Sequence, residues 1–166
     1  MVDQAAQFVT QVVFVLIAVL TAAEFARERG PRSRDAALMF AALAGIIAIQ
    51  WFTSVTTVQS RWLTVAGSVM ILAQPYLLIR LVRHVRAVPS AFARLALAGM
   101  VVSWAIVIAQ PPPLPLAPTL VVLIYFAAAE LYAGAALVRG ALAERGQARR
   151  RLTYAAAGSC LLAALI

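Results

Sequence analysis

The stretch that most constrains the fold runs from Trp62 to Pro89 and reads WLTVAGSVMILAQPYLLIRLVRHVRAVP. It begins with an aromatic residue of the kind found at membrane interfaces, and no charge appears before Arg80. A helix needs about 20 mostly apolar residues to cross the hydrocarbon of a bilayer. This pattern therefore predicts a membrane-spanning helix with a basic inner end.

Pro75 lies in the inner half of this predicted helix, between Gln74 and Tyr76. A proline inside a helix removes one backbone hydrogen bond, and its ring clashes with the carbonyl of the residue four positions earlier, here Ile71. We therefore expect a kink just before the arginines, which makes Pro75 a hinge candidate. A kinked helix of this kind is suited to act as a lever, and it is also a common structural feature.

Composition supports a membrane protein, because apolar residues make up 64% of the 166-residue chain and the mean hydropathy is +0.92. The net charge of +8 does not indicate a nucleic-acid partner, since the basic residues lie in short turns between apolar runs. All 14 cations are arginines, which excludes a retinal bound to a membrane lysine. One cysteine and one histidine allow neither an internal disulfide nor a multi-histidine metal site, so no cofactor is expected.

The apolar runs predict an all-α fold, a polytopic bundle of transmembrane helices with five complete spans and a truncated sixth. Gly30-Pro31 should end the first helix, and the second should begin near Ser33-Arg34-Asp35. Prolines from Pro111 to Pro118 should form a stiff extended connection between the fourth and fifth spans. The expected spans form a single membrane domain and cover approximately residues 8–26, 35–55, 62–82, 91–109, 117–138 and 152–166.

The final apolar run, residues 152–166, is short for a span. At 1.5 Å per residue it would make roughly 22 Å of helix, against about 30 Å of hydrocarbon. We therefore expect the chain to be an N-terminal fragment of a longer one.

The arginines also predict the orientation in the membrane. The first, third and fifth connections hold 13 arginines, whereas the second holds only Arg61 and the fourth holds none. Because cytoplasmic loops are enriched in cations, the odd connections should be cytoplasmic and the N-terminus outside. Small residues suit close helix packing, and the candidate positions are Gly45, Gly67, Gly134 and Gly140.

Glu130 is the main candidate for a proton or ligand site. It precedes Arg139 by nine residues, about 13 Å of helix, and so lies inside the hydrocarbon. A charge at that depth costs at least about 2.5 kcal/mol, so the side chain should face the other helices and be paired or protonated. Alternatively, its role is structural, as a neutral carboxyl bonded to Gln74, Gln50 or a hydroxyl.

Further ligand or proton candidates are Gln74 and Tyr76, at a similar expected depth, and Tyr132, two residues from Glu130. For Gln74, a structural hydrogen bond between helices is the competing interpretation. The sequence contains no motif of a metalloprotease, serine hydrolase or nucleotide-binding loop. No catalytic residue is therefore assigned, and any enzyme activity would require further sequence.

The run from Gln74 to Val82, QPYLLIRLV, resembles the N-terminal polytopic membrane modules that precede GAF, PAS, histidine kinase or cyclase domains in bacterial signalling proteins. The resemblance implies a multi-pass sensory input module of a two-component system in the bacterial inner membrane. Kinase activity would then belong to a C-terminal part that this chain lacks. A transporter or membrane-assembly subunit that uses Glu130 is the alternative. Expected partners are the lipid bilayer and anionic lipid head groups at the arginine-rich loops, and a second copy forming a homodimer is a further candidate.

Overall fold

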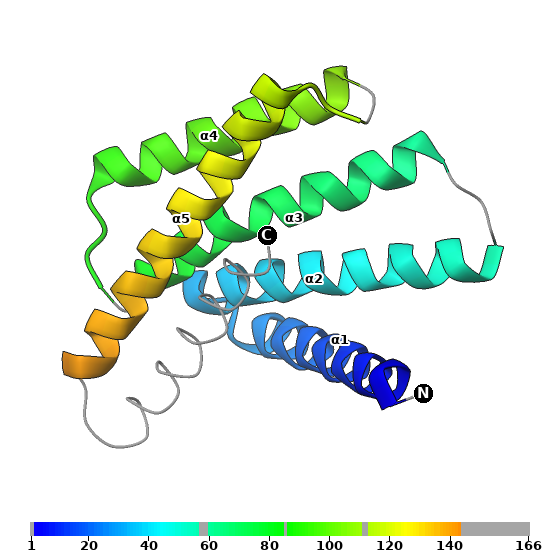
Figure 1. The fold of residues 1–166 in the computed structure, drawn as a ribbon. Coiled ribbons are helices and arrows are strands. Elements are labelled where there is room, and N and C mark those ends of the chain that lie inside the picture. Colours follow the sequence, from blue (N-terminus) through cyan, green and yellow to red (C-terminus); the bar gives the residue numbers. More distant parts are fainter. Residues whose placement is uncertain (1, 57–59, 85, 111–112, 144–166) are drawn as a thin grey trace. The chain divides into compact units, whose positions relative to one another are not determined.

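The computed structural model describes residues 2–56, 60–84, 86–110 and 113–143. Within these ranges it contains five α-helices and no strand (Figure 1). All five are long and apolar enough to cross a membrane. The all-α fold and five spans are thus confirmed, whereas the predicted sixth span at residues 152–166 lies outside the described residues. The helices are α1 (Val2–Glu28), α2 (Pro31–Thr56), α3 (Arg61–Val82), α4 (Ser90–Ala109) and α5 (Leu116–Ala143).

The chain divides into two compact units, residues 1–77 and 78–166. The first unit contains α1, α2 and most of α3, and the second contains the end of α3 together with α4 and α5. The division therefore falls inside a helix and not in a connecting loop.

In the first unit, α1 and α2 pack side by side around a tight turn (Figure 1). Arg29, directly after α1, has a left-handed backbone with φ of 46°, and its N–H donates to the oxygen of Phe25 over 2.9 Å. Pro31 then opens α2, so the helix begins a few residues before the start predicted near Ser33-Arg34-Asp35. A proline fits the first position of a helix, because its missing N–H has no partner there in any case.

At the end of α1 and α2 opposite the turn, polar side chains connect the two helices. Trp51 in α2 donates from Nε1 to Oε1 of Gln11 in α1 over 2.7 Å, and Gln11 reaches Gln50 over a longer 3.4 Å. The ring of Phe8 stacks on Trp51 with centroids 6.2 Å apart. The two helices are therefore held at both ends, by the turn and by this cluster.

Glycine positions show where α3 approaches α2. A Cβ at Gly45 would lie 2.7 Å from Sδ of Met70, so Gly45 is a close-packing position as predicted. The same prediction for Gly67 was wrong, because nothing described lies within 4 Å of where its Cβ would be.

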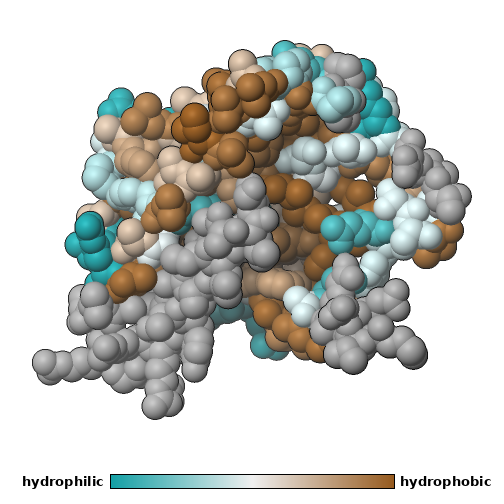
Figure 2. Space-filling view, viewed as in Figure 1, coloured by the Kyte–Doolittle hydropathy of each residue, from teal (hydrophilic) through white to brown (hydrophobic). Residues whose placement is uncertain are grey.

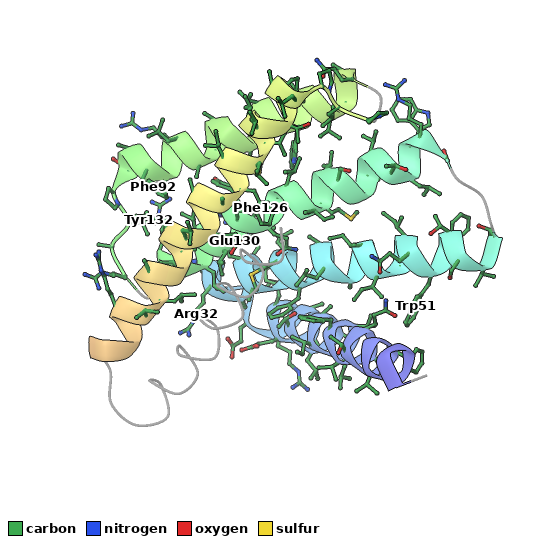
Figure 3. The ribbon with its side chains drawn as sticks, viewed as in Figure 1. Arg32, Trp51, Phe92, Phe126, Glu130 and Tyr132 are labelled. Carbon is green, nitrogen blue, oxygen red and sulfur yellow. The ribbon has the colours of Figure 1, made fainter. Side chains whose placement is uncertain are left out.

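In the second unit, α4 and α5 form an antiparallel pair. Phe92 stacks on Tyr132 with ring centroids 3.7 Å apart (Figure 3). A Cβ at Gly99 would collide with the ring of Tyr125. These two contacts are separated by seven residues in each helix, in opposite directions, which is the register of antiparallel neighbours.

The proline-rich connection ends earlier than predicted. Pro118 does not interrupt α5 but lies in its first turn, which begins at Leu116. The first N–H to bond within this turn is that of Thr119, which donates to the oxygen of Pro115 over 3.1 Å. The N–H groups in the first turn of a helix have no helical acceptor. The missing N–H of Pro118 therefore costs α5 no helical hydrogen bond.

Large apolar side chains are exposed on all five helices, and apolar surface dominates much of the face shown in Figure 2. The most exposed include Val55, Trp62, Leu95, Leu116 and Ile124. In water such a surface would be a liability, whereas lipid tails solvate it without cost.

Candidate functional site

Glu130 lies on the buried face of α5, and only 3% of the residue is exposed. On that face Phe126 (Figure 3), Ala129 and Ala133 are also buried, at the spacing of one side of a helix. Adjacent Leu131 is 60% exposed on the other side of the helix. Glu130 is thus buried within the protein, and its predicted orientation away from lipid agrees with this burial.

Tyr132 does not belong to the same site as Glu130. Two residues along a helix correspond to a rotation of about 200°, so the two side chains leave α5 on different sides. The half-buried Tyr132 packs on Phe92 and lines a small cavity with Arg86 and Arg139. The structure therefore separates these two candidates into different environments.

Gln74 makes a defined structural contact within the first unit. Its Nε2 donates to the backbone oxygen of Met39 in α2 over 3.0 Å, and the side chain is half-buried. This hydrogen bond between helices supports the structural interpretation of Gln74. Tyr76 is also half-buried. Gln74 and Tyr76 belong to the first unit and Glu130 to the second. The expected contact of Gln74 or Tyr76 with Glu130 therefore stays a prediction.

Pro75 is fully buried inside α3, on the same face as Leu72, Ile79 and Val82. The helix is continuous through the proline from Arg61 to Val82. The division between the two units comes between residues 77 and 78, just beyond Pro75. The role of Pro75 as a hinge remains a prediction. Its position is two residues before the division between the units.

Sequence reasoning missed two positions on α4. At Gly99 the ring of Tyr125 occupies the space that a side chain would need. Ser103, one turn later, is 0% exposed. Within the described ranges, the Oγ of Ser103 has no hydrogen-bond partner. The signal was present, because two small residues four positions apart are typical of helix interfaces in membranes.

In the part of the chain that the structure describes, no group of three or more His, Cys, Asp or Glu side chains is placed to hold a metal ion. Comparisons of the chain with protein-family models, curated proteins and solved structures gave no match. The five apolar helices define the class, an all-helical multi-pass membrane protein.

Proposed function

We propose that the chain is a membrane-embedded sensory input module of a bacterial signal-transduction protein in the inner membrane, with α3 as the element that transmits the signal. One observation carries this proposal. The boundary between the two compact units falls inside α3, just after Pro75. A single helix thus contributes to both units, and its weakest backbone point lies next to the boundary.

Pro75 has no backbone N–H to donate. The carbonyl of Ile71 loses its helical donor, and the ring crowds the same carbonyl, so bending costs less here than elsewhere in α3. A signal that repacks one unit would change the angle of α3 at Pro75. The helix then leads to Arg80 and to the basic connection that follows. In this proposal that connection is cytoplasmic and passes the change to an output domain, such as a histidine kinase.

A test of this function uses the full-length gene product in membrane vesicles. We expect incorporation of phosphate from labelled ATP, and we expect Pro75→Ala to change its rate severalfold while leaving the amount of inserted protein unchanged. Ser68→Ala, which removes only a hydrogen bond to Thr64 within α3, is the matched control. A full-length product without any phosphate incorporation would contradict the kinase assignment.

The lever itself is tested by distance measurements between spin labels in lipid bilayers. Cysteines replace the exposed Val55 and Leu95, one in each unit, in a Cys160→Ala background. Pro75→Ala should narrow the distance distribution, because it restores the helical hydrogen bond. A control pair at Leu95 and Ile124, both in the second unit, should not change. If the distance distribution between positions 55 and 95 is identical in the parent protein and in Pro75→Ala, α3 does not bend at Pro75 and the proposed lever is wrong.

The burial of Glu130 favours a second candidate, a transporter or assembly subunit in which this carboxyl couples or binds substrate. Reconstituted liposomes with an internal pH dye distinguish the two functions. Proton flux that disappears in Glu130→Gln would support transport, whereas the sensory module predicts no flux that depends on Glu130.

A further inference from the structure

At one end of the second unit, Arg86 and Arg139 line a small cavity together with Tyr132, and the proposed function does not use this cavity. The cavity has a volume of about 60 Å³. Arg86 and Ala87 come from the connection after α3, and the remaining residues come from one side of α5. Those residues are Tyr132, Ala135, Ala136 and Arg139.

Local structure holds the walls of this cavity. The connection after α3 closes in a tight turn, in which the N–H of Arg86 donates to the oxygen of Val82 over 2.8 Å. Val82 itself is 1% exposed, so the turn is tied to a buried residue. On the other side, Tyr132 is packed against Phe92 at the start of α4. The two alanines between Tyr132 and Arg139 have short side chains, which leaves the space open.

The charges around the cavity are unbalanced. Both Arg86 and Arg139 are exposed, and neither side chain has an ion pair or hydrogen bond among the described residues. The described part of the second unit holds five arginines and a single carboxylate, Glu130. Glu130 leaves α5 on another side and lies about 13 Å along the helix from Arg139, so it does not pair with Arg139. Two guanidinium groups at one cavity repel each other unless an anion lies between them.

We propose that Arg86, Arg139 and Tyr132 form a binding site for a phosphate group. Guanidinium groups match phosphate oxygens in geometry and charge, and a phenol O–H adds a neutral donor. The apolar spans of α3 and α5 end at Val82 and Gly140, beside the two arginines. The cavity therefore lies where a spanning helix meets the lipid head groups, so an anionic lipid and soluble phosphate are the two sources of this chemistry.

The experiment counts lipids bound to the purified chain by native mass spectrometry, after reconstitution in phosphatidylcholine with added phosphatidic acid. Arg86→Gln/Arg139→Gln should weaken phosphatidic acid binding by at least about 10-fold, since it removes two charged hydrogen-bond donors from the cavity at once. Tyr132→Phe keeps the packing on Phe92 and should weaken binding by about threefold or more. Inorganic phosphate, titrated in a separate arm, shows whether the site takes soluble phosphate instead, with the same dependence on the two arginines.

The matched control is Arg83→Gln/Arg94→Gln, which removes the same charge from two other exposed arginines of the second unit. It should leave binding within about threefold, because attraction between separated exposed charges is screened by salt. If the two double variants lose phosphatidic acid binding equally, the lipid is attracted to the basic surface in general, and the proposed phosphate site is wrong. Unchanged binding of both phosphatidic acid and inorganic phosphate in Arg86→Gln/Arg139→Gln would overturn it as well. Circular dichroism confirms that each variant is folded.

Discussion

Gln74 in α3 donates a hydrogen bond from Nε2 to the backbone oxygen of Met39 in α2, over 3.0 Å. A carbonyl oxygen has two lone pairs, so it accepts this bond in addition to a helical one. The contact joins two spans by a polar bond in surroundings that offer few other donors. It is one of the specific interactions that decide how α3 is oriented on α2.

Gln74→Leu should lower the free energy of unfolding by about 1 kcal/mol, because hydrogen bonds between membrane helices contribute about 0.6 kcal/mol on average and up to about 1.7. The measurement is unfolding by sodium dodecyl sulfate in mixed micelles, followed by circular dichroism. Ser68→Ala removes a bond inside α3 and should have almost no effect. If the two variants unfold at the same detergent fraction, the bond from Gln74 contributes nothing to stability.

Gly99→Ala and Gly67→Ala should have opposite effects. A methyl group at Gly99 collides with the ring of Tyr125, so we expect a loss of about 1–3 kcal/mol from overpacking. Around Gly67 the space is open, so alanine should be neutral or should stabilise the helix by up to about 1 kcal/mol. Thermal unfolding in one detergent compares them directly. Combining Gly99→Ala with Tyr125→Leu should recover part of the loss, and a stable Gly99→Ala single variant would contradict the packing of α4 on α5.

The predicted orientation is tested with single cysteines in a Cys160→Ala background. Cysteine at Gly30 should be protected from an impermeant thiol reagent in intact cells, because the arginine distribution predicts that this turn is cytoplasmic. The position tolerates a side chain, since its Cβ would lie 3.5 Å from Oγ of Ser33, an ordinary contact. Cysteine at Ser60 should react from outside. The opposite labelling pattern would reverse the orientation.

Glu130→Gln should preserve folding, because it keeps the size and hydrogen bonding of the buried side chain. Glu130→Leu should cost about 1–3 kcal/mol, since Glu130 makes an interaction that leucine cannot make through a polar group. Detergent unfolding measures both variants. Infrared spectroscopy supplies the second readout, in which a protonated carboxyl band should be present in the parent protein and absent from Glu130→Gln. A parent spectrum without this band would show that Glu130 is ionised.

The positions of the spans follow from residue type alone. The helix predicted at 62–82 is α3 (Arg61–Val82), and the helix predicted at 91–109 is α4 (Ser90–Ala109). A helix in lipid satisfies its own backbone hydrogen bonds, so local apolar sequence is sufficient to place it. Pro31 and Pro118 were misjudged because proline was treated as a break in both cases, whereas both lie within the first turn of a helix. The spacing of proline from the first helical residue decides between these outcomes.

The neighbours of each span could not be derived in the same way. Gly45, Gly67 and Gly99 are the same residue type in similar apolar surroundings, yet Gly45 meets Met70, Gly99 meets Tyr125 and Gly67 meets nothing described. Lipid tails are as apolar as the side chains, so an apolar helix carries no stripe that marks its buried face. Small residues and polar hydrogen bonds then determine which helices pack together. In the sequence, several small residues are equally suited to such a packing position.

The sequence by itself determined that this protein is an all-helical, multi-pass membrane protein and that Glu130 should face away from lipid. Both conclusions depend on the cost of placing polar groups in hydrocarbon, which belongs to each residue and not to its neighbours. Only the tertiary structure decided that Gln74 bonds to Met39 and that Tyr132 lines a cavity with two arginines. Those contacts join residues far apart in the chain, and they depend on the rotation of each helix about its axis, which a uniformly apolar sequence leaves open.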